Sequence, residues 1–137
     1  MVEITLTYEG DLHCVARHMP SGNTLVTDAP VDNNGRGQAF SPTDLVATAL
    51  ASCMATVIGI VAQRKNIAVA GMTVTIRKSM SADLPRRIQR LEVDLRMPLP
   101  ASHPERKMLE SAAGGCPVLH SLHPRIAVVL RWKWLDG

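Results

Sequence analysis

The sequence predicts an α+β fold with antiparallel sheets around one long buried central helix. Three observations lead to this prediction. Several short segments alternate apolar and polar residues, as half-buried strands do. Residues 45–62 form an uncharged run with the length of a long helix. Strand and helix patterns alternate too sparsely along the chain for a doubly wound parallel sheet.

The first residues predict a small antiparallel meander. Alternation over residues 2–8 indicates a strand, and residues 12–18 and 24–27 are typical of two more. Turn-forming residues separate these segments at 9–11 and 20–23. A polar loop over residues 28–38 then leads to the long helix.

The long helix has a clear start. Ser41 is a good N-cap, Pro42 suits the first helical position, and Asp44 completes a capping box. The pattern extends to Arg64 and Lys65, whose charges favour a helix C-terminus. A run this apolar could span a membrane. Its alanines and hydroxyl residues, without flanking aromatic residues, instead favour a buried helix of a soluble protein with no membrane partner.

The second half of the chain predicts a hairpin, two short helices and a last strand. Strands are expected at 69–80 and 88–97, joined around 83–85. A helix over 104–113 ends at two glycines, and a further helical turn runs from the Cys116–Pro117 pair to about residue 122. The last strand covers 126–135, with Trp132 and Trp134 on one face.

Composition limits the function classes. The 137 residues are 46% hydrophobic and 20% charged, which predicts one globular domain over 1–137. Aromatic residues make up only 3%, too few to stack nucleic-acid bases, and the net charge of +3 does not require an anionic partner. Three cysteines do not form a disulfide framework, and no signal peptide opens the chain, so a cytoplasmic location is expected.

The cysteines are the candidate reactive groups. Cys116 precedes Pro117 as an N-cap precedes the first helical residue, and backbone N–H groups there favour a thiolate. The two preceding glycines are expected to keep its sulfur accessible. Cys53 lies inside the apolar helix, where burial disfavours the thiolate, and Cys14 lies in a strand and is interpreted as structural. The residues alone therefore favour Cys116 as the reactive thiol.

A metal site and a cofactor site are not expected. Cys116, His120 and His123 are spaced like ligands, but no fourth ligand accompanies them. The glycines around Arg36 are too few for a phosphate-binding loop, and no Gly-x-Ser-x-Gly elbow is present.

Two segments together resemble the OsmC/Ohr family of osmotically induced and organic hydroperoxide resistance proteins. They are SPTDLVATALASCMAT at residues 41–56 and AAGGCPVLHSL at 112–122. The loop TDAP-x-D-x-x-G-x-G before the helix, the segment LPRRI-x-x-L-x-V-x-L and the closing strand with tryptophans also agree. The resemblance covers essentially the whole chain and implies an OsmC-like fold.

The resemblance implies a thiol-dependent hydroperoxide reductase. Cys53 would attack an organic or hydrogen peroxide, and Cys116 would resolve the sulfenic acid as a disulfide, which reverses the ranking from the residues alone. An external thiol or lipoyl protein would reduce that disulfide. The family also implies an intertwined homodimer, which agrees with a helix apolar on every side that one short chain can hardly cover.

One departure from the family pattern concerns activation of the thiol. Family reductases carry Asn-Pro-Glu at the start of the helix, whereas Thr43 occupies the glutamate position here. The activating arginine is expected to be Arg36, with Arg17 as the alternative. Loss of the glutamate also leaves open a non-catalytic binding protein that keeps the fold and an apolar interface pocket.

Overall fold

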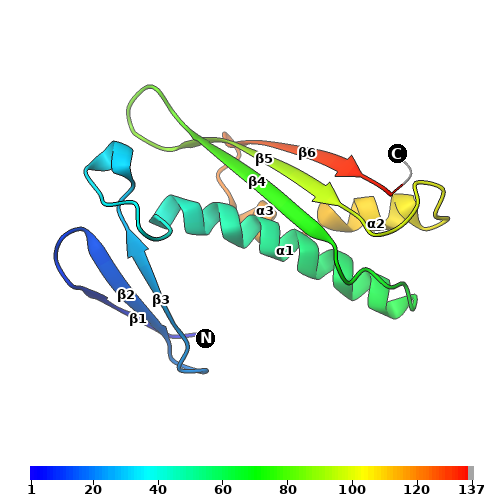
Figure 1. Ribbon diagram of the computed structural model, residues 1–137, viewed down its shortest axis with the longest axis horizontal. Helices are drawn as coiled ribbons and strands as arrows, with labels where there is room; N and C mark the ends of the chain where they lie inside the picture. The colour runs from blue at the N-terminus through cyan, green and yellow to red at the C-terminus, as the bar shows by residue number, and fades with distance from the viewer. Residues whose placement is uncertain (136–137) are drawn as a thin grey trace. The chain divides into compact units, whose positions relative to one another are not determined.

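The computed structural model describes residues 1–135. The chain forms two compact units, the first of residues 1–46 and the second beginning at Ala47. Helix α1, Pro42–Arg64, begins in the first unit and continues through the second (Figure 1). The single domain over 1–137 stays a prediction.

The first unit is the predicted antiparallel meander. Its three strands are β1 (Ile4–Tyr8), β2 (His13–His18) and β3 (Thr24–Asp28), in the order β1-β2-β3. Every residue of β1 is exposed, including Ile4 at 63% and Tyr8 at 60%. This sheet therefore has apolar side chains that the first unit itself does not cover.

The loop after β3 depends on glycine. It contains the short 3-10 helix η1, Val31–Asn33. A Cβ atom on Gly35 would lie 1.7 Å from the Ala29 carbonyl oxygen, so only glycine fits there. Gly37 has φ +64, a left-handed conformation that side chains rarely adopt. The loop holds Arg36 between these two glycines.

The predicted capping box at the start of α1 is confirmed. The Asp44 backbone N–H donates to Ser41 Oγ at 3.0 Å, and the Ser41 N–H donates to Asp44 Oδ2 at 2.9 Å. Both orphan N–H groups are thus satisfied by the reciprocal pair of side chains. Ser41 is 1% exposed, so the cap is shielded from water.

Only one face of α1 is covered within the chain. Five residues at helical spacing are buried: Ala47, Leu50, Met54, Ile58 and Ala62. Another stripe is exposed and consists of Thr48, Ser52, Thr56 and Ile60. The helix is long and apolar enough to cross a membrane by length and composition, yet its buried face belongs to the hydrophobic core. This one-sided burial agrees with the expectation that one short chain can hardly cover the helix, while the homodimer stays a prediction.

The second sheet is mixed rather than antiparallel. Strands β4 (Thr73–Met80) and β5 (Ile88–Arg96) form the expected antiparallel hairpin. Strand β6 (Ala127–Lys133) pairs with β5 in parallel. Between them the chain forms α2 (Arg106–Ala113) and α3 (Pro117–Ser121), a crossover long enough to return it in the same direction.

The core of the second unit lies between this sheet and α1 (Figure 1). Leu91, Val93 and Leu95 of β5 are fully buried and belong to one cluster with Leu50 and Met54 of the helix. Trp132 and Trp134 stack with ring centroids 6.2 Å apart, which confirms their predicted common face. The buried Trp134 indole N–H donates to Glu110 at 3.0 Å.

Candidate functional site

Cys53 and Cys116 come together in the second unit. Cys53 is half-buried on α1, one residue before the core residue Met54. Cys116 caps α3 and is fully buried. Cys53 packs against the core cluster that contains Cys116, and its thiol is close enough to influence the pKa of Cys116. Residues far apart in the sequence thus form one dithiol site.

Cys116 is a true N-cap. Its backbone is extended, Pro117 follows at the first helical position, and the Leu119 N–H donates to the sulfur at 3.5 Å. The cap is local in origin, because α2 ends at Gly114 and only Gly115 separates that C-cap from Cys116.

The pKa of the Cys116 thiol is raised above its ordinary value. Burial is the largest cause, and the neighbouring Cys53 thiol adds to it. The backbone N–H groups of Leu119 and Val118 act in the opposite direction but are outweighed. The expectation of an accessible, thiolate-favouring Cys116 is therefore wrong, because the thiol is closed off from water.

An apolar groove lies beside the dithiol. Its volume is about 420 Å3, and it lies between α1 and α2. Val57 lies one helical turn beyond Cys53, and Gly115 directly precedes Cys116, so the groove is next to both cysteines. Its lining is mostly hydrophobic: Val57, Ile60, Val61, Met108, Ser111, Ala112 and Gly115. An apolar group fits this groove better than a charged one.

The candidate activating arginines belong to the first unit. Arg36 is exposed and forms an ion pair with Asp11 at 3.2 Å. Arg17 lies in β2, in register with Thr5 and Thr24, and is also exposed. The roles of Arg36 and Arg17 toward Cys53 stay predictions.

Thr43 takes part in the helix cap. Its hydroxyl lies 3.2 Å from Ser41 Oγ. The residue in the family's glutamate position is therefore engaged at the start of α1. A threonine hydroxyl carries no charge with which to hold a guanidinium.

The first unit contains a contact between a histidine and two acidic residues that the sequence patterns did not predict. His13 Nδ1 lies 2.6 Å from Asp28 Oδ1, and Nε2 lies 3.6 Å from Glu9 Oε1. The strand pattern could have indicated this contact. His13 begins one strand of the meander and Asp28 ends the neighbouring strand, so the two residues are cross-strand partners. The contact between His13 and Asp28 links β2 to β3 at the end of β3, where the loop that contains Arg36 begins.

The remaining cysteine and histidines have other surroundings. Cys14 lies in β2, opposite Tyr8 and Thr27. His120 Nε2 is 3.0 Å from the Gly114 carbonyl oxygen, and His123 Nδ1 accepts from a backbone N–H. Within residues 1–135 no group of three or more His, Cys, Asp or Glu residues could hold a metal ion.

Comparisons with known proteins agree with this fold. A family model described as OsmC-like protein matches residues 35–131. A protein from Psychrobacter arcticus 273-4, named for osmotic stress induction and the detoxification response, is 44% identical, with 96% of each chain covered and a TM-score of 0.90. No curated protein matches the sequence.

More distant solved structures share the fold. An organic hydroperoxide resistance protein OsmC from Legionella pneumophila is 18% identical, with a TM-score of 0.77 over 97% of this chain and 96% of that one. An organic hydroperoxide resistance protein from Vibrio cholerae with captopril in one active site is 19% identical, with a TM-score of 0.76 over 96% and 90%. At these identities the likeness shows the architecture alone.

Proposed function

Because this chain belongs to the OsmC-like protein family, which includes hydroperoxide resistance proteins, we propose that it is a thiol-dependent hydroperoxide reductase. The observation that carries the proposal is the proximity of Cys53 to Cys116 in the core of the second unit. Two neighbouring thiols can form a disulfide after one of them is oxidised.

The roles of the two cysteines follow from their surroundings. The raised pKa of Cys116 disfavours its thiolate, which makes it the poorer first nucleophile. Cys53 is also the less buried of the two. Cys53 is therefore the attacking sulfur and Cys116 the resolving one.

The reaction proceeds in three steps. The Cys53 thiolate attacks the terminal peroxide oxygen, so an S–O bond forms, the O–O bond breaks, and the alkoxide leaves and takes a proton as the alcohol. The Cys116 sulfur then attacks the sulfenic acid, forming the disulfide and releasing water. An external dithiol, of the small-thiol or lipoyl class, restores both thiols by exchange and is itself oxidised to a disulfide.

The apolar groove supports an organic peroxide as substrate. Its lining by Val57, Val61 and Met108 would bury an alkyl or aryl substituent beside Cys53. Burial of such a group contributes about 25 cal/mol per Å2 of apolar surface removed from water. Hydrogen peroxide, with no apolar substituent, would gain nothing from this groove.

A second copy of the chain is the partner that we propose. The Thr48–Ser52–Thr56–Ile60 stripe of α1 is exposed in the second unit, and the apolar residues of β1 are exposed in the first. A homodimer would bury both surfaces without requiring another kind of protein. Proteins of this family are soluble, and we propose a cytoplasmic location for this one, where thiols are kept reduced.

Peroxide consumption tests the function directly. Purified protein is given cumene hydroperoxide and dihydrolipoamide, and residual peroxide is measured over time. The wild type and Cys14→Ser should consume peroxide, whereas Cys53→Ser should not. Equal consumption by Cys53→Ser would exclude Cys53 as the attacking residue.

The alternative function is binding without chemistry. Thr43 in the family's glutamate position favours it, because no carboxylate there can hold an arginine. If the wild type consumes no peroxide with dihydrolipoamide or small thiols, a binding protein that uses the apolar groove is the better interpretation.

A further inference from the structure

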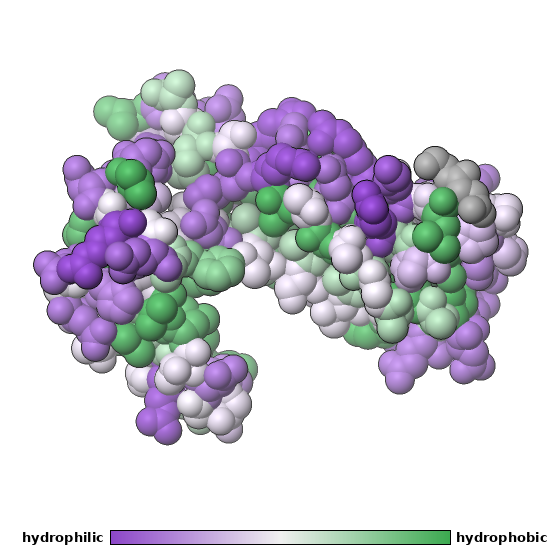
Figure 2. Space-filling view, in the orientation of Figure 1, coloured by the Kyte–Doolittle hydropathy of each residue, from purple (hydrophilic) through white to green (hydrophobic). Residues whose placement is uncertain are grey.

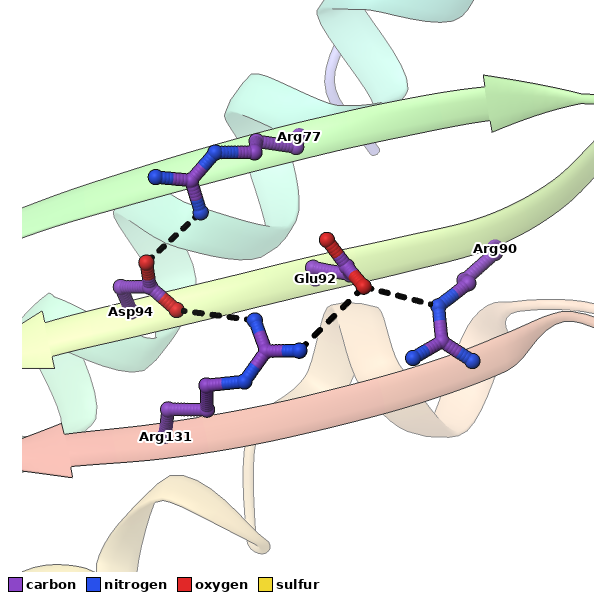
Figure 3. A network of polar contacts seen from close by, with 5 residues as sticks. All are labelled: Arg77, Arg90, Glu92, Asp94 and Arg131. Atoms are coloured by element: carbon purple, nitrogen blue, oxygen red, sulfur yellow. Dashed lines mark hydrogen bonds and ion pairs between the residues drawn. The ribbon is translucent and has the colours of Figure 1, made fainter.

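The outer face of the β4-β5-β6 sheet carries a ladder of charged residues that the dithiol chemistry does not use. Arg77 donates to Asp94 at 2.6 Å, and Arg131 donates to Asp94 at 3.4 Å and to Glu92 at 3.3 Å. Arg90 donates to Glu92 at 3.0 Å (Figure 3). Two carboxylates are therefore shared among three guanidinium groups.

The acidic members of this ladder are already paired. Asp94 uses Oδ2 for Arg77 and Oδ1 for Arg131, and these contacts lower the pKa of the carboxyl group. Glu92 accepts from both Arg90 and Arg131 at Oε1, and these contacts lower its pKa in the same way. Both carboxylates therefore hold the guanidinium groups in place.

The next row of the sheet contains no acid. Arg96 stands directly opposite Thr73 on one side and Lys133 on the other. Like charges directly opposite each other on one face destabilise a sheet. Within residues 1–135 neither Arg96 nor Lys133 has an ion-pair partner. This row is therefore short of negative charge.

A hollow lies over these rows. Its volume is about 530 Å3, within the range of sites that take small molecules. The lining includes Asp94, which is paired with Arg77 and Arg131. It also includes four basic side chains and two hydroxyl groups: Arg77, Arg96, Arg131, Lys133, Thr73 and Thr75. Figure 2 shows hydrophilic residues gathered over these strands. Hydroxyl and guanidinium donors together are the groups that bind carboxylates and phosphates.

We propose that this hollow binds a small multivalent oxyanion, a molecule with at least two carboxylate or phosphate groups. One group sits on Arg96, Lys133 and Thr73 and relieves the repulsion within that row. A second group sits near Arg131, one row along the strands, about 7 Å away by strand geometry. Single-stranded nucleic acid is a poorer fit, because the lining includes a single aromatic residue, Trp132, and its side chain packs against the core.

Isothermal titration calorimetry at low salt tests the proposal with two probes, pyrophosphate and citrate. Wild-type protein should bind at least one of them saturably, and the preferred probe identifies phosphate or carboxylate as the recognised group. The double variant Arg96→Gln/Lys133→Gln should weaken binding by about tenfold or more, because it removes the unpaired row. The bound anion should also raise the melting temperature of the wild type.

The matched control is Lys107→Gln/Arg125→Gln, which removes the same charge from two exposed positions outside the hollow. It should keep the wild-type affinity. Equal weakening in both double variants would mean unspecific attraction and would overturn the proposal, as would the absence of saturable binding to either probe. Because Arg96→Gln/Lys133→Gln removes a repulsion, its melting temperature without anion should be no lower than that of the wild type, which separates lost binding from lost folding. This outcome does not depend on whether the dithiol reduces peroxides.

Discussion

Cys116, the N-cap of α3, lies next to Cys53 in the middle of α1. The two thiols are thus brought together in the reduced protein, before any oxidant arrives. A disulfide needs Cα atoms within about 7 Å or a backbone movement. Because the two side chains are neighbours, we expect any such movement to be small.

One equivalent of cumene hydroperoxide should convert this pair into a disulfide. Peptide mapping by mass spectrometry should find a Cys53–Cys116 bridge and a reduced Cys14. In Cys116→Ser the reaction should stop at the sulfenic acid, which dimedone would trap at Cys53. A bridge that includes Cys14, or no bridge at all, would contradict the proposed roles.

Arg36→Ala should slow iodoacetamide alkylation of Cys53 at neutral pH by about tenfold, because a nearby guanidinium stabilises a thiolate. Asp11→Asn should have the opposite effect, since Asp11 now holds Arg36 in an exposed ion pair. Peptide mapping by mass spectrometry measures the alkylation rate of Cys53 separately from that of the other two cysteines.

Arg17→Ala is the matched control for that experiment. If it abolishes alkylation while Arg36→Ala has no effect, the activating residue is in the strand instead of the loop. Thr43→Glu adds a carboxylate at the start of α1 that could hold an arginine, and peroxide turnover should rise. A fall in turnover would show that the hydroxyl contact of Thr43 with Ser41 matters more than the charge.

Ser41→Ala should lower the free energy of unfolding by about 1 kcal/mol, because it removes the side chain that caps α1. Urea denaturation followed by circular dichroism measures the change. Ser102→Ala, at an exposed position in a loop, should change it by less than about 0.5 kcal/mol. Equal effects of the two substitutions would mean that the cap adds no stability.

The Asp94 ion pairs should make stability depend on pH. The pKa of Asp94 is held below its ordinary value of 3.8, chiefly by the hydrogen bond from Arg77. The resulting stabilisation is present in full above that ordinary value and is lost as pH falls through the lower pKa of the folded protein. The difference in melting temperature between wild type and Asp94→Asn should therefore shrink as the pH is lowered from about 7 to about 3. Glu3→Gln, an exposed charge outside the ladder, should show a small difference at every pH.

Light scattering should give a mass about twice the 14.9 kDa of one chain at micromolar concentration. Ile60→Asp puts a charge on the exposed stripe of α1 and should shift the protein toward monomer. Leu84→Asp, on the exposed β4–β5 hairpin, should leave the mass unchanged. A wild-type monomer would exclude the proposed homodimer.

Local patterns predicted most of the elements. The alternation in residues 2–8, the capping box at Ser41 and the Cys116–Pro117 pair all depend on neighbours within a few residues. The structure confirms the strand, the capping box and the N-cap, although β1 is exposed along its whole length and not half-buried. The resemblance to a family predicted the pairing of Cys53 with Cys116, which the residues alone did not. Their own chemistry favoured Cys116 as the accessible thiol.

Long-range packing decided the rest. The parallel pairing of β5 with β6 depends on where the chain returns after α2 and α3, and no local period encodes that return. The burial of Cys116 depends on the side chains that close around the end of α2, and this burial outweighs the N-cap that its sequence predicted. The basic residues are scattered along the sequence, and only the strand register aligns Arg96 with Lys133 on one face. The period of apolar residues along a helix or strand predicts which face of that element a residue occupies. Which residues lie beside it on the neighbouring strands depends on the whole fold.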